Sequence, residues 1–183
     1  VSDNLDRLAG LTGLRPFHRR GHLLGPARTV RTRPGDNLFI HKMLDVVEPG
    51  DVVVVAGEGD VSRALVGEIM KAIAEKRVVA GFVIDGAIRD SAAFAASDFP
   101  CFARGVTHRG PYKDGPGALD VPVAISGAVV SPGDIVVGDE DGIVTFSPDI
   151  AAALAGAVQK QIAREAEIMQ SIADGSYKGA YAK

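Results

Sequence analysis

The chain has 183 residues, a formal net charge of -3 and a hydrophobic fraction of 46%, values typical of one globular domain over residues 1–183. This charge balance gives no electrostatic reason to expect nucleic acid or a membrane surface as a partner, and no apolar run approaches the roughly 18 residues of a spanning helix. The single cysteine, Cys101, excludes an internal disulfide and suits a reducing compartment. We therefore expect a cytoplasmic domain with an aliphatic core.

The predicted elements of the first half alternate between strands and helices. Residues 22–32 alternate apolar and polar side chains, the period of a half-buried strand. Pro-Gly-Asp turns at 49–51 and 132–134 each lead into a β-branched run, VVVV and IVV, that we expect to form buried strands. Residues 57–85 combine a glycine-rich loop, an amphipathic helix and a second β-branched run, which predicts a strand–helix–strand unit.

Two starts are open for the helix in this unit. Asp60 is a suitable N-cap residue. Alternatively, the helix restarts after Gly67, because glycine inside a helix costs about 1 kcal/mol relative to alanine. The expected helix has an apolar face formed by Leu65, Ile69, Ala72 and Ile73.

The second half of the chain predicts short strands and one long helix. The strands are expected at 100–105, 121–126, 127–131, 134–139 and 142–146. Ser147 followed by Pro148 is typical of an N-cap and the first helical position. An alanine-rich helix over 148–173 follows and ends near Gly175. The fold class is therefore α/β, with the order of the strands undetermined.

Three charged residues follow a buried run in the stretch VIDGAIRDSAAF. If that strand ends at Asp85, then Asp85, Arg89 and Asp90 lie at its carboxyl end, where α/β sheets gather their ligands. Arginine presents a planar fork that matches a carboxylate, and aspartate supplies hard oxygen to a divalent cation. The alternative is structural: Asp85 caps a turn, and Arg89 with Asp90 form surface charges or an N-cap.

Two further acidic or glycine-rich stretches are weaker candidates. The loop 57–68 meets a helix start that favours anions, but it lacks a Walker Gly-Lys-Ser/Thr. Glu68 there could hold a water of a metal ion or belong to a solvated helix face. The stretch 138–142, GDEDG, alternates acids, yet the twelfth position, counted with Asp139 as the first, is Ile150 rather than the glutamate of an EF-hand. A hairpin turn that uses Asp141-Gly142 is the better interpretation there.

The histidines give weak signals. His18 and His22 stand four apart, but the intervening Gly21 argues against a helical metal site. His108 lies in a glycine-rich region, where it is either a loop residue or a phosphate-carrying histidine.

Several stretches together resemble the RraA-like family. They are GPARTVRTRPGDNLFIHKMLD, PGDVVVVAGEGDVSRALVGEIM, AGFVIDGAIRD, FPCFARGVT and VSPGDIVVGDEDGIVTFSP, so the resemblance spans nearly all of residues 23–148. The most specific element is Glu68, twenty intervening residues and then Arg89-Asp90, which looks like the family's acid, spacer, Arg-Asp signature. This family includes 4-hydroxy-4-methyl-2-oxoglutarate aldolases with oxaloacetate decarboxylase activity and the regulator of ribonuclease E activity.

The resemblance implies a role for each residue of this motif. Asp90 would ligate a divalent metal, Mg²⁺ or Mn²⁺, and Glu68 would hold one of the metal's waters. Arg89 would bind the keto or carboxylate oxygen of the substrate. Gly67, Ile69 and Met70 would also bind the substrate, with the backbone N–H groups of Ile69 and Met70 holding its carboxylate.

That last role requires a helix that begins near Gly67, because only the first turn of a helix leaves N–H groups free. The family also has a carboxylate near the C-terminus that enters a neighbouring subunit's site. Glu165 is the nearest match, with Glu167 as a competitor. The implied fold is a single-domain layered α/β sandwich of the swivelling β/β/α type, assembled as a homotrimer or homohexamer.

The implied activity is that of a carbon–carbon lyase on a 2-keto acid. Cleavage of a 4-hydroxy-2-keto acid and decarboxylation of oxaloacetate share one enolate and both release pyruvate, so one site can serve both reactions. The alternative is a non-catalytic, protein-binding regulator of ribonuclease activity on the same fold. The physiological substrate, the preferred metal, the general base and the choice between trimer and hexamer stay open.

Overall fold

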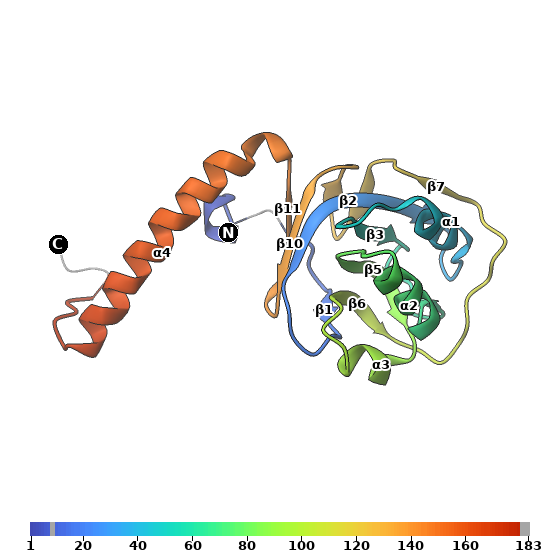
Figure 1. Ribbon diagram of the computed structural model, residues 1–183, viewed down its shortest axis with the longest axis horizontal. Helices are drawn as coiled ribbons and strands as arrows, with labels where there is room; N and C mark the ends of the chain where they lie inside the picture. Colours follow the sequence, from blue (N-terminus) through green and yellow to red (C-terminus); the bar gives the residue numbers. More distant parts are fainter. Residues whose placement is uncertain (8–9, 180–183) are drawn as a thin grey trace.

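The computed structural model describes residues 1–7 and 10–179 and shows a layered α/β body from which one long helix extends (Figure 1). The main sheet has the order β1-β6-β5-β3-β2-β10-β11, with β4 added beside β5 and β7 beside β2, and β8 pairs with β9 separately. The strands are β1 (Arg15–Pro16), β2 (Leu23–Thr32), β3 (Val52–Ala56), β4 (Ala64–Val66), β5 (Gly81–Ile88), β6 (Cys101–Val106), β7 (Gly117–Leu119), β8 (Val123–Ile125), β9 (Ala128–Val130), β10 (Ile135–Asp139) and β11 (Gly142–Phe146).

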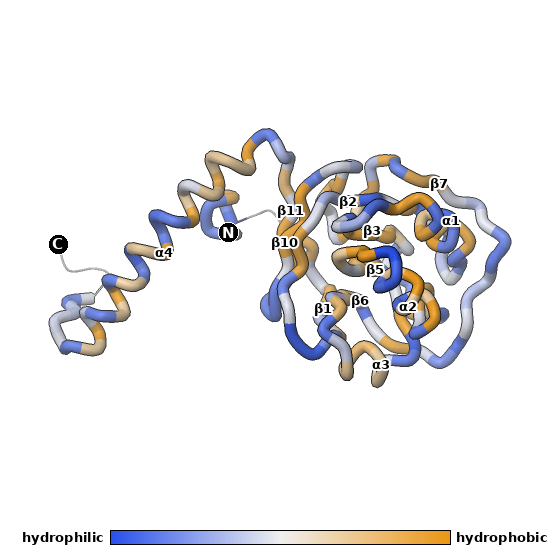
Figure 2. Tube along the Cα trace, in the orientation of Figure 1, coloured by the Kyte–Doolittle hydropathy of each residue, from blue (hydrophilic) through white to orange (hydrophobic). Residues whose placement is uncertain are grey.

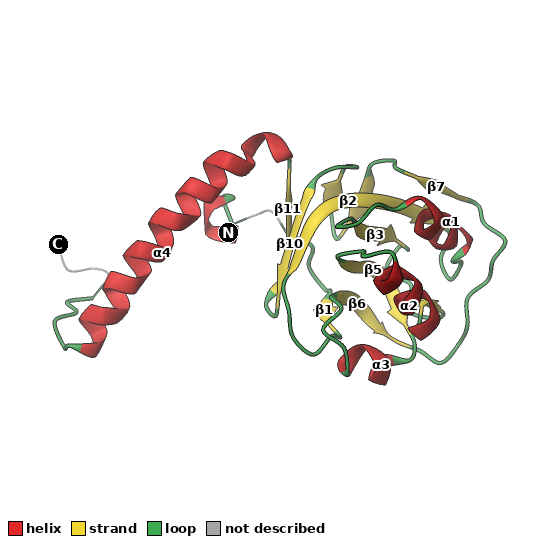
Figure 3. Ribbon diagram, in the orientation of Figure 1, coloured by secondary structure: helices red, strands yellow, loops and turns green. Residues whose placement is uncertain are grey.

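Short helices lie beside the sheet, and one long helix extends from it (Figure 3). They are α1 (Leu38–Val46), α2 (Glu68–Lys76), α3 (Ser91–Ala95) and α4 (Ala151–Ala173), with short 3-10 turns η1 (Ser2–Asn4) and η2 (Pro148–Ile150). None of them, within the described part of the chain, is long and apolar enough to cross a membrane.

The core has two faces because successive side chains of the buried strands point to opposite sides of the sheet. β2, β3, β5 and β6 pair in parallel, and every residue of β3 and β5 is buried. Val53 and Val55 pack with buried residues of α1, α2 and α3. Val52 and Val54 pack on the other face with the β8–β9 pair. Figure 2 shows this apolar centre along β3 and β5. The predicted layered α/β architecture is confirmed.

The predicted strands and the long helix are present, with small changes at their ends. Ser147 Oγ accepts the N–H of Asp149 at 3.3 Å, and Pro148 follows it, as expected of an N-cap. The predicted helix over 148–173 begins with the 3-10 turn η2 before α4 starts at Ala151. Pro-Gly-Asp at 34–36, in contrast with the other two such turns, leads into the helix α1 rather than a strand.

The prediction that the strand ends at Asp85 is wrong. β5 continues to Ile88, and its last residues pair with strands on both sides: Ala87 lies opposite Ala64 of β4 and Gly105 of β6. Asp85 is consequently a buried residue inside β5 rather than a turn residue. Its carboxylate accepts hydrogen bonds from Arg104 Nε and from the N–H of Gly59. The bond from Gly59 attaches the loop before β4 to Asp85, at the centre of the sheet.

The helix α4 leaves the sheet after β11 and extends away from the body, on the side opposite α2 and α3 (Figure 1). Along α4 only Leu154 is buried. Ile162, Met169 and Ile172 are exposed large apolar residues on this helix. Its free length therefore offers an apolar surface that its own body does not cover.

Candidate functional site

The Arg-Asp pair forms the turn between β5 and α3, and two hydrogen bonds hold this turn against the start of α2. Arg89 N–H donates to the carbonyl of Val66 at 3.0 Å, and Asp90 Oδ2 accepts the N–H of Glu68 at 3.0 Å. Asp90 adopts a left-handed conformation, with φ of 55° and ψ of 39°, which aspartate tolerates better than most residues. The structure thus brings Glu68, Arg89 and Asp90 together, as the motif predicts.

Gly67 makes this close approach possible. A Cβ at position 67 would lie 2.5 Å from Asp90 Oδ2 and 2.9 Å from Arg89 Cγ, distances that no real side chain adopts without a shift. Gly67 is the N-cap of α2, so the later of the two helix starts is correct.

The first turn of α2 leaves backbone donors for a ligand. The N–H of Lys71 is the first to bond back along the helix, to the carbonyl of Gly67 at 3.0 Å. The N–H of Glu68 is used by Asp90, whereas those of Ile69 and Met70 have no partner within a regular helix. A helix N-terminus with free N–H groups favours an anion such as a carboxylate.

A cavity of about 100 Å³ lies beside this turn. It is formed by the starts of α1 and α2, by β4, by the turn after β5 and by the loop that precedes β7. Its walls consist of Asn37, His41, Ala64, Leu65, Val66, Gly67, Ile69, Met70, Arg89, Pro111 and Lys113. Four residues predicted to bind substrate are therefore on one cavity wall, with Glu68 and Asp90 next to them.

Three residues of this cavity were missed by the sequence analysis: Asn37, His41 and Lys113. The signal for the first two was Asp36-Asn37 before the apolar-periodic stretch LFIHKML, a typical helix start that was not assigned. Lys113 lies in a loop without a pattern. Burial, and then the charge of Lys113, lower the pKa of His41 below its usual value. At neutral pH the cavity therefore has two fixed cations, Arg89 and Lys113, and an uncharged imidazole.

Asp36 holds the Lys113 loop against α1. Its side chain is fully buried and accepts the N–H groups of Leu38, Asp114 and Gly115 at 2.9, 2.7 and 2.9 Å. Burial raises the pKa of Asp36, but these N–H donors outweigh burial, and the pKa lies below its usual value.

We expect Asp36→Asn to lower the free energy of unfolding by about 3 kcal/mol at pH 7, because an amide cannot accept all of these bonds. The folded-state pKa is the lower one, so this stability is present above the unfolded pKa of Asp36 and is lost as the pH falls through the folded value. Urea unfolding of both proteins from pH 7 downwards measures the difference. Asp114→Asn is the matched control, since its side chain is 74% exposed. If the free energies of unfolding of the unmodified protein and Asp36→Asn differed by the same amount at every pH, stability would not be linked to the Asp36 pKa.

The other candidates from the sequence have structural places. His18 Nδ1 accepts the N–H of Cys101 at 3.2 Å, and its ring packs edge-on against Phe102. His108 is exposed in the loop after β6. Among the described residues, no group of three or more histidine, cysteine, aspartate or glutamate side chains is arranged to hold a metal. Glu165 accepts a bond from Gln161 of its own helix.

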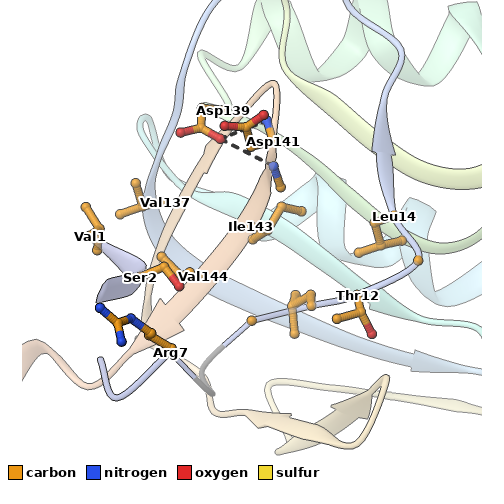
Figure 4. A pocket seen from close by; sticks show the side chains of 14 residues that line it. Val1, Ser2, Arg7, Thr12, Leu14, Val137, Asp139, Asp141, Ile143 and Val144 are labelled. Carbon is orange, nitrogen blue, oxygen red and sulfur yellow. Dashed lines mark hydrogen bonds between the residues drawn. The ribbon is translucent and has the colours of Figure 1, made fainter. Parts of the chain in front are cut away.

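The larger cavity, about 600 Å³, lies between the N-terminal segment and the β10–β11 hairpin and contains none of the predicted site residues (Figure 4). The carboxylate of Asp139 accepts the N–H groups of Asp141 and Gly142 at 3.0 and 3.3 Å (Figure 4). Asp139 pairs with Gly142 across the hairpin. The stretch GDEDG thus forms a hairpin turn, as expected, but its loop residues are Glu140 and Asp141, and Gly142 begins β11.

Known proteins are similar to this chain in sequence and in fold. A family model for RraA-like proteins, described as Aldolase/RraA, matches residues 1–145. The chain is 42% identical to a Halalkalibacterium halodurans protein provisionally named as a 4-hydroxy-4-methyl-2-oxoglutarate aldolase. The match extends over 147 residues, which are 80% of this chain and 70% of that protein.

Two solved structures agree with this match. The RNA-processing inhibitor RraA from Thermus thermophilis is 30% identical with a TM-score of 0.73, over 80% of this chain and 92% of that one. Streptomyces coelicolor RraAS2, described as an unusual member of the RNase ES inhibitor RraA protein family, is 29% identical with a TM-score of 0.81, over 90% and 86%. The chain, with its Glu68 and Arg89-Asp90 motif, belongs to the RraA-like family.

Proposed function

We propose that this protein is a divalent-metal-dependent lyase that releases pyruvate from a 4-hydroxy-2-keto acid and from oxaloacetate. The observation that supports this most is the convergence of Arg89 and the first turn of α2 on one cavity, beside the Asp90 carboxylate. The name of the Halalkalibacterium halodurans relative points to the same chemistry.

The site has the type of ligand that suits Mg²⁺ or Mn²⁺. Carboxylate oxygens are the ligands that these cations prefer. One oxygen of Asp90 is bound to the N–H of Glu68, so Oδ1 is the atom we assign to the metal, and the exposed carboxylate of Glu68 would hold a water. A bound cation would supply Lewis acidity toward the keto acid.

A third carboxylate is proposed to come from another copy of the chain. Within the described residues the site has only Asp90 and Glu68, fewer than the three groups that would form a metal cluster. Glu165 lies on α4, which extends away from its own site (Figure 1). A homotrimer or homohexamer in which α4 contacts a neighbour would bring Glu165 to that neighbour's cavity and would cover the exposed Ile162 and Met169.

The residues of the cavity then have distinct tasks. The N–H groups of Ile69 and Met70 bind the carboxylate of the keto acid. Arg89 donates to the keto oxygen and stabilises the negative charge that develops there as the C3–C4 bond breaks. Glu68 is placed to hold the water that receives the proton of the C4 hydroxyl. Retro-aldol cleavage and decarboxylation both leave the enolate of pyruvate, which a proton then converts to product.

The test is a coupled assay for pyruvate with purified protein, 4-hydroxy-4-methyl-2-oxoglutarate or oxaloacetate, and Mg²⁺ or Mn²⁺. We expect pyruvate release well above the rate with metal alone, and loss of that release with a chelator. A rate equal to the metal-only rate for both substrates, across a wider panel of 4-hydroxy-2-keto acids, would refute the proposed function.

A second candidate function is regulation of RNA processing, since the Thermus thermophilis and Streptomyces coelicolor structures are described as inhibitors. A pull-down with ribonuclease E and an RNA decay assay test it. Binding that persists in the double variant Arg89→Ala, Asp90→Ala, together with no lyase activity in the unmodified protein, would favour the regulator.

A further inference from the structure

Lys113 is a charged residue whose backbone is fixed on both sides. Before it, the N–H of Tyr112 donates to a carbonyl of the Pro-Gly-Asp turn at 2.8 Å, and the Tyr112 carbonyl accepts the N–H of Asn37 at 3.0 Å. After it, the next two N–H groups donate to the buried Asp36 carboxylate at 2.7 and 2.9 Å. The base of the Lys113 side chain is therefore held at the cavity, although the residue itself is exposed.

The loop that carries Lys113 also passes beside Arg89. A Cβ built on Gly110 would lie 3.4 Å from Arg89 Nη1. Arg89 and Lys113 line the same cavity, and they are the only two of its described lining residues with a charge at neutral pH, since the pKa of His41 is lowered by burial and by Lys113. The cavity thus has two separate cations, one on the turn after β5 and one on the loop before β7.

The proposed substrates have two carboxylates, and the tasks assigned above account for only one of them. The N–H groups of Ile69 and Met70 bind the carboxylate next to the ketone, and Arg89 donates to the keto oxygen. The distal carboxylate is a second full negative charge, which is costly to remove from water without a cation beside it. Among the described lining residues, Lys113 is the cation that has no task in the reaction.

We propose that Lys113 binds the distal carboxylate of the substrate and makes the site selective for 2-keto acids with two carboxylates. This inference rests on the proposed function and assigns the residue at the far end of its substrate. A charge-assisted hydrogen bond from an ammonium group to a carboxylate is among the stronger polar contacts. The flexible stem of lysine also lets this group follow carboxylates at different distances from the ketone.

The same contact should favour aldol cleavage over decarboxylation. In both reactions the electron pair of the C3–C4 bond passes to the enolate of pyruvate. In 4-hydroxy-4-methyl-2-oxoglutarate, the C4 hydroxyl gives its proton to the water beside Glu68 and becomes a ketone, and the distal carboxylate keeps its charge. In oxaloacetate the distal carboxylate itself leaves as neutral CO₂. Lys113 therefore stabilises the ground state of decarboxylation more than its transition state, which slows that chemical step.

The test compares two ligands that the proposed reaction does not cleave, 2-oxoglutarate and pyruvate, by isothermal titration calorimetry with Mn²⁺ present. Only 2-oxoglutarate has a distal carboxylate. We expect Lys113→Met to weaken its binding about 10- to 50-fold, the loss of one charge-assisted hydrogen bond, and to leave pyruvate binding unchanged. Lys113→Arg should keep most of the affinity. Lys42→Met, the matched control at an exposed lysine of α1 outside the cavity, should change neither.

The kinetics of Lys113→Met give a second measurement. For 4-hydroxy-4-methyl-2-oxoglutarate, KM should rise about 10- to 50-fold and kcat should stay within about threefold, because the contact is equally strong in the ground and transition states. For oxaloacetate, kcat should rise, because the cation no longer holds the leaving carboxylate.

The outcomes separate this inference from the proposed function. If neither substrate releases pyruvate but 2-oxoglutarate binding depends on Lys113, the proposed function fails and the assigned contact stands. If Lys113→Met weakens both ligands equally, or neither of them, Lys113 does not contact the distal carboxylate and the inference is wrong. Equal affinity of the unmodified protein for the two ligands, or no binding of 2-oxoglutarate, would also overturn it.

Discussion

Replacing Arg89 with alanine should lower kcat/KM for pyruvate release about 100- to 1000-fold, the usual loss when one donor to a developing oxyanion is removed. Arg89 lines the cavity, and its backbone is fixed by the bond to Val66. The fold does not depend on its side chain, which is 43% exposed. The loss should therefore appear in activity and leave the thermal unfolding temperature close to that of the unmodified protein.

Two further variants sharpen this prediction. Arg89→Lys should recover only part of the activity, because an ammonium group lacks the planar fork of arginine. Arg20→Ala, at an exposed arginine outside the cavity, should keep full activity. Arg89→Ala with more than a fifth of the original kcat/KM would show that the enolate is stabilised elsewhere.

Replacing Asp90 with asparagine should weaken the binding of Mn²⁺ at least about 100-fold, because the charged oxygen ligand is lost. Asparagine can still accept the N–H of Glu68 through its amide oxygen and tolerates the left-handed conformation that Asp90 adopts. The start of α2 should therefore stay in place. Electron paramagnetic resonance of free Mn²⁺ during a titration measures the affinity without any activity assay.

The matched control is Asp141→Asn, in the acidic hairpin turn of β10 and β11. This residue lies in the stretch that superficially resembles a calcium loop. The variant therefore tests whether any exposed acidic residue contributes to Mn²⁺ binding. We expect its Mn²⁺ affinity to equal that of the unmodified protein. Unchanged affinity in Asp90→Asn, or a loss in Asp141→Asn of the same size, would place the metal elsewhere.

Local patterns were sufficient for the buried strands and for α4. The β-branched runs of β3 and β5 and the alternation of apolar and polar residues in β2 can be recognised from residues adjacent in the sequence. Ser147-Pro148 is likewise a local signal for a helix start. The motif of Glu68 and Arg89-Asp90 also located the turn correctly, since the helix start it requires at Gly67 is present.

The features that were predicted wrongly or not at all depend on contacts between distant segments. β5 extends past Asp85 through pairing with both β4 and β6, and three residues of β4 are too few to show a period. The cavity joins Asn37 and His41 of α1 to Lys113 of a loop that Asp36 anchors. A sequence pattern reports the environment along one element, whereas this cavity is enclosed by several segments that meet only after folding.

The hydrogen bond between Asp90 Oδ2 and the N–H of Glu68 links two stretches of chain that are 22 residues apart. On the proposed function, one oxygen of this carboxylate would bind a cation, and the other orients the helix end where an anion would bind. A substitution that removes both oxygens would therefore affect both sites, whereas asparagine would affect the cation alone. Divergence among enzymes built this way should therefore preserve the turn and alter the opposite wall, at positions such as Asn37 and Lys113, where new substrates can be accommodated one contact at a time.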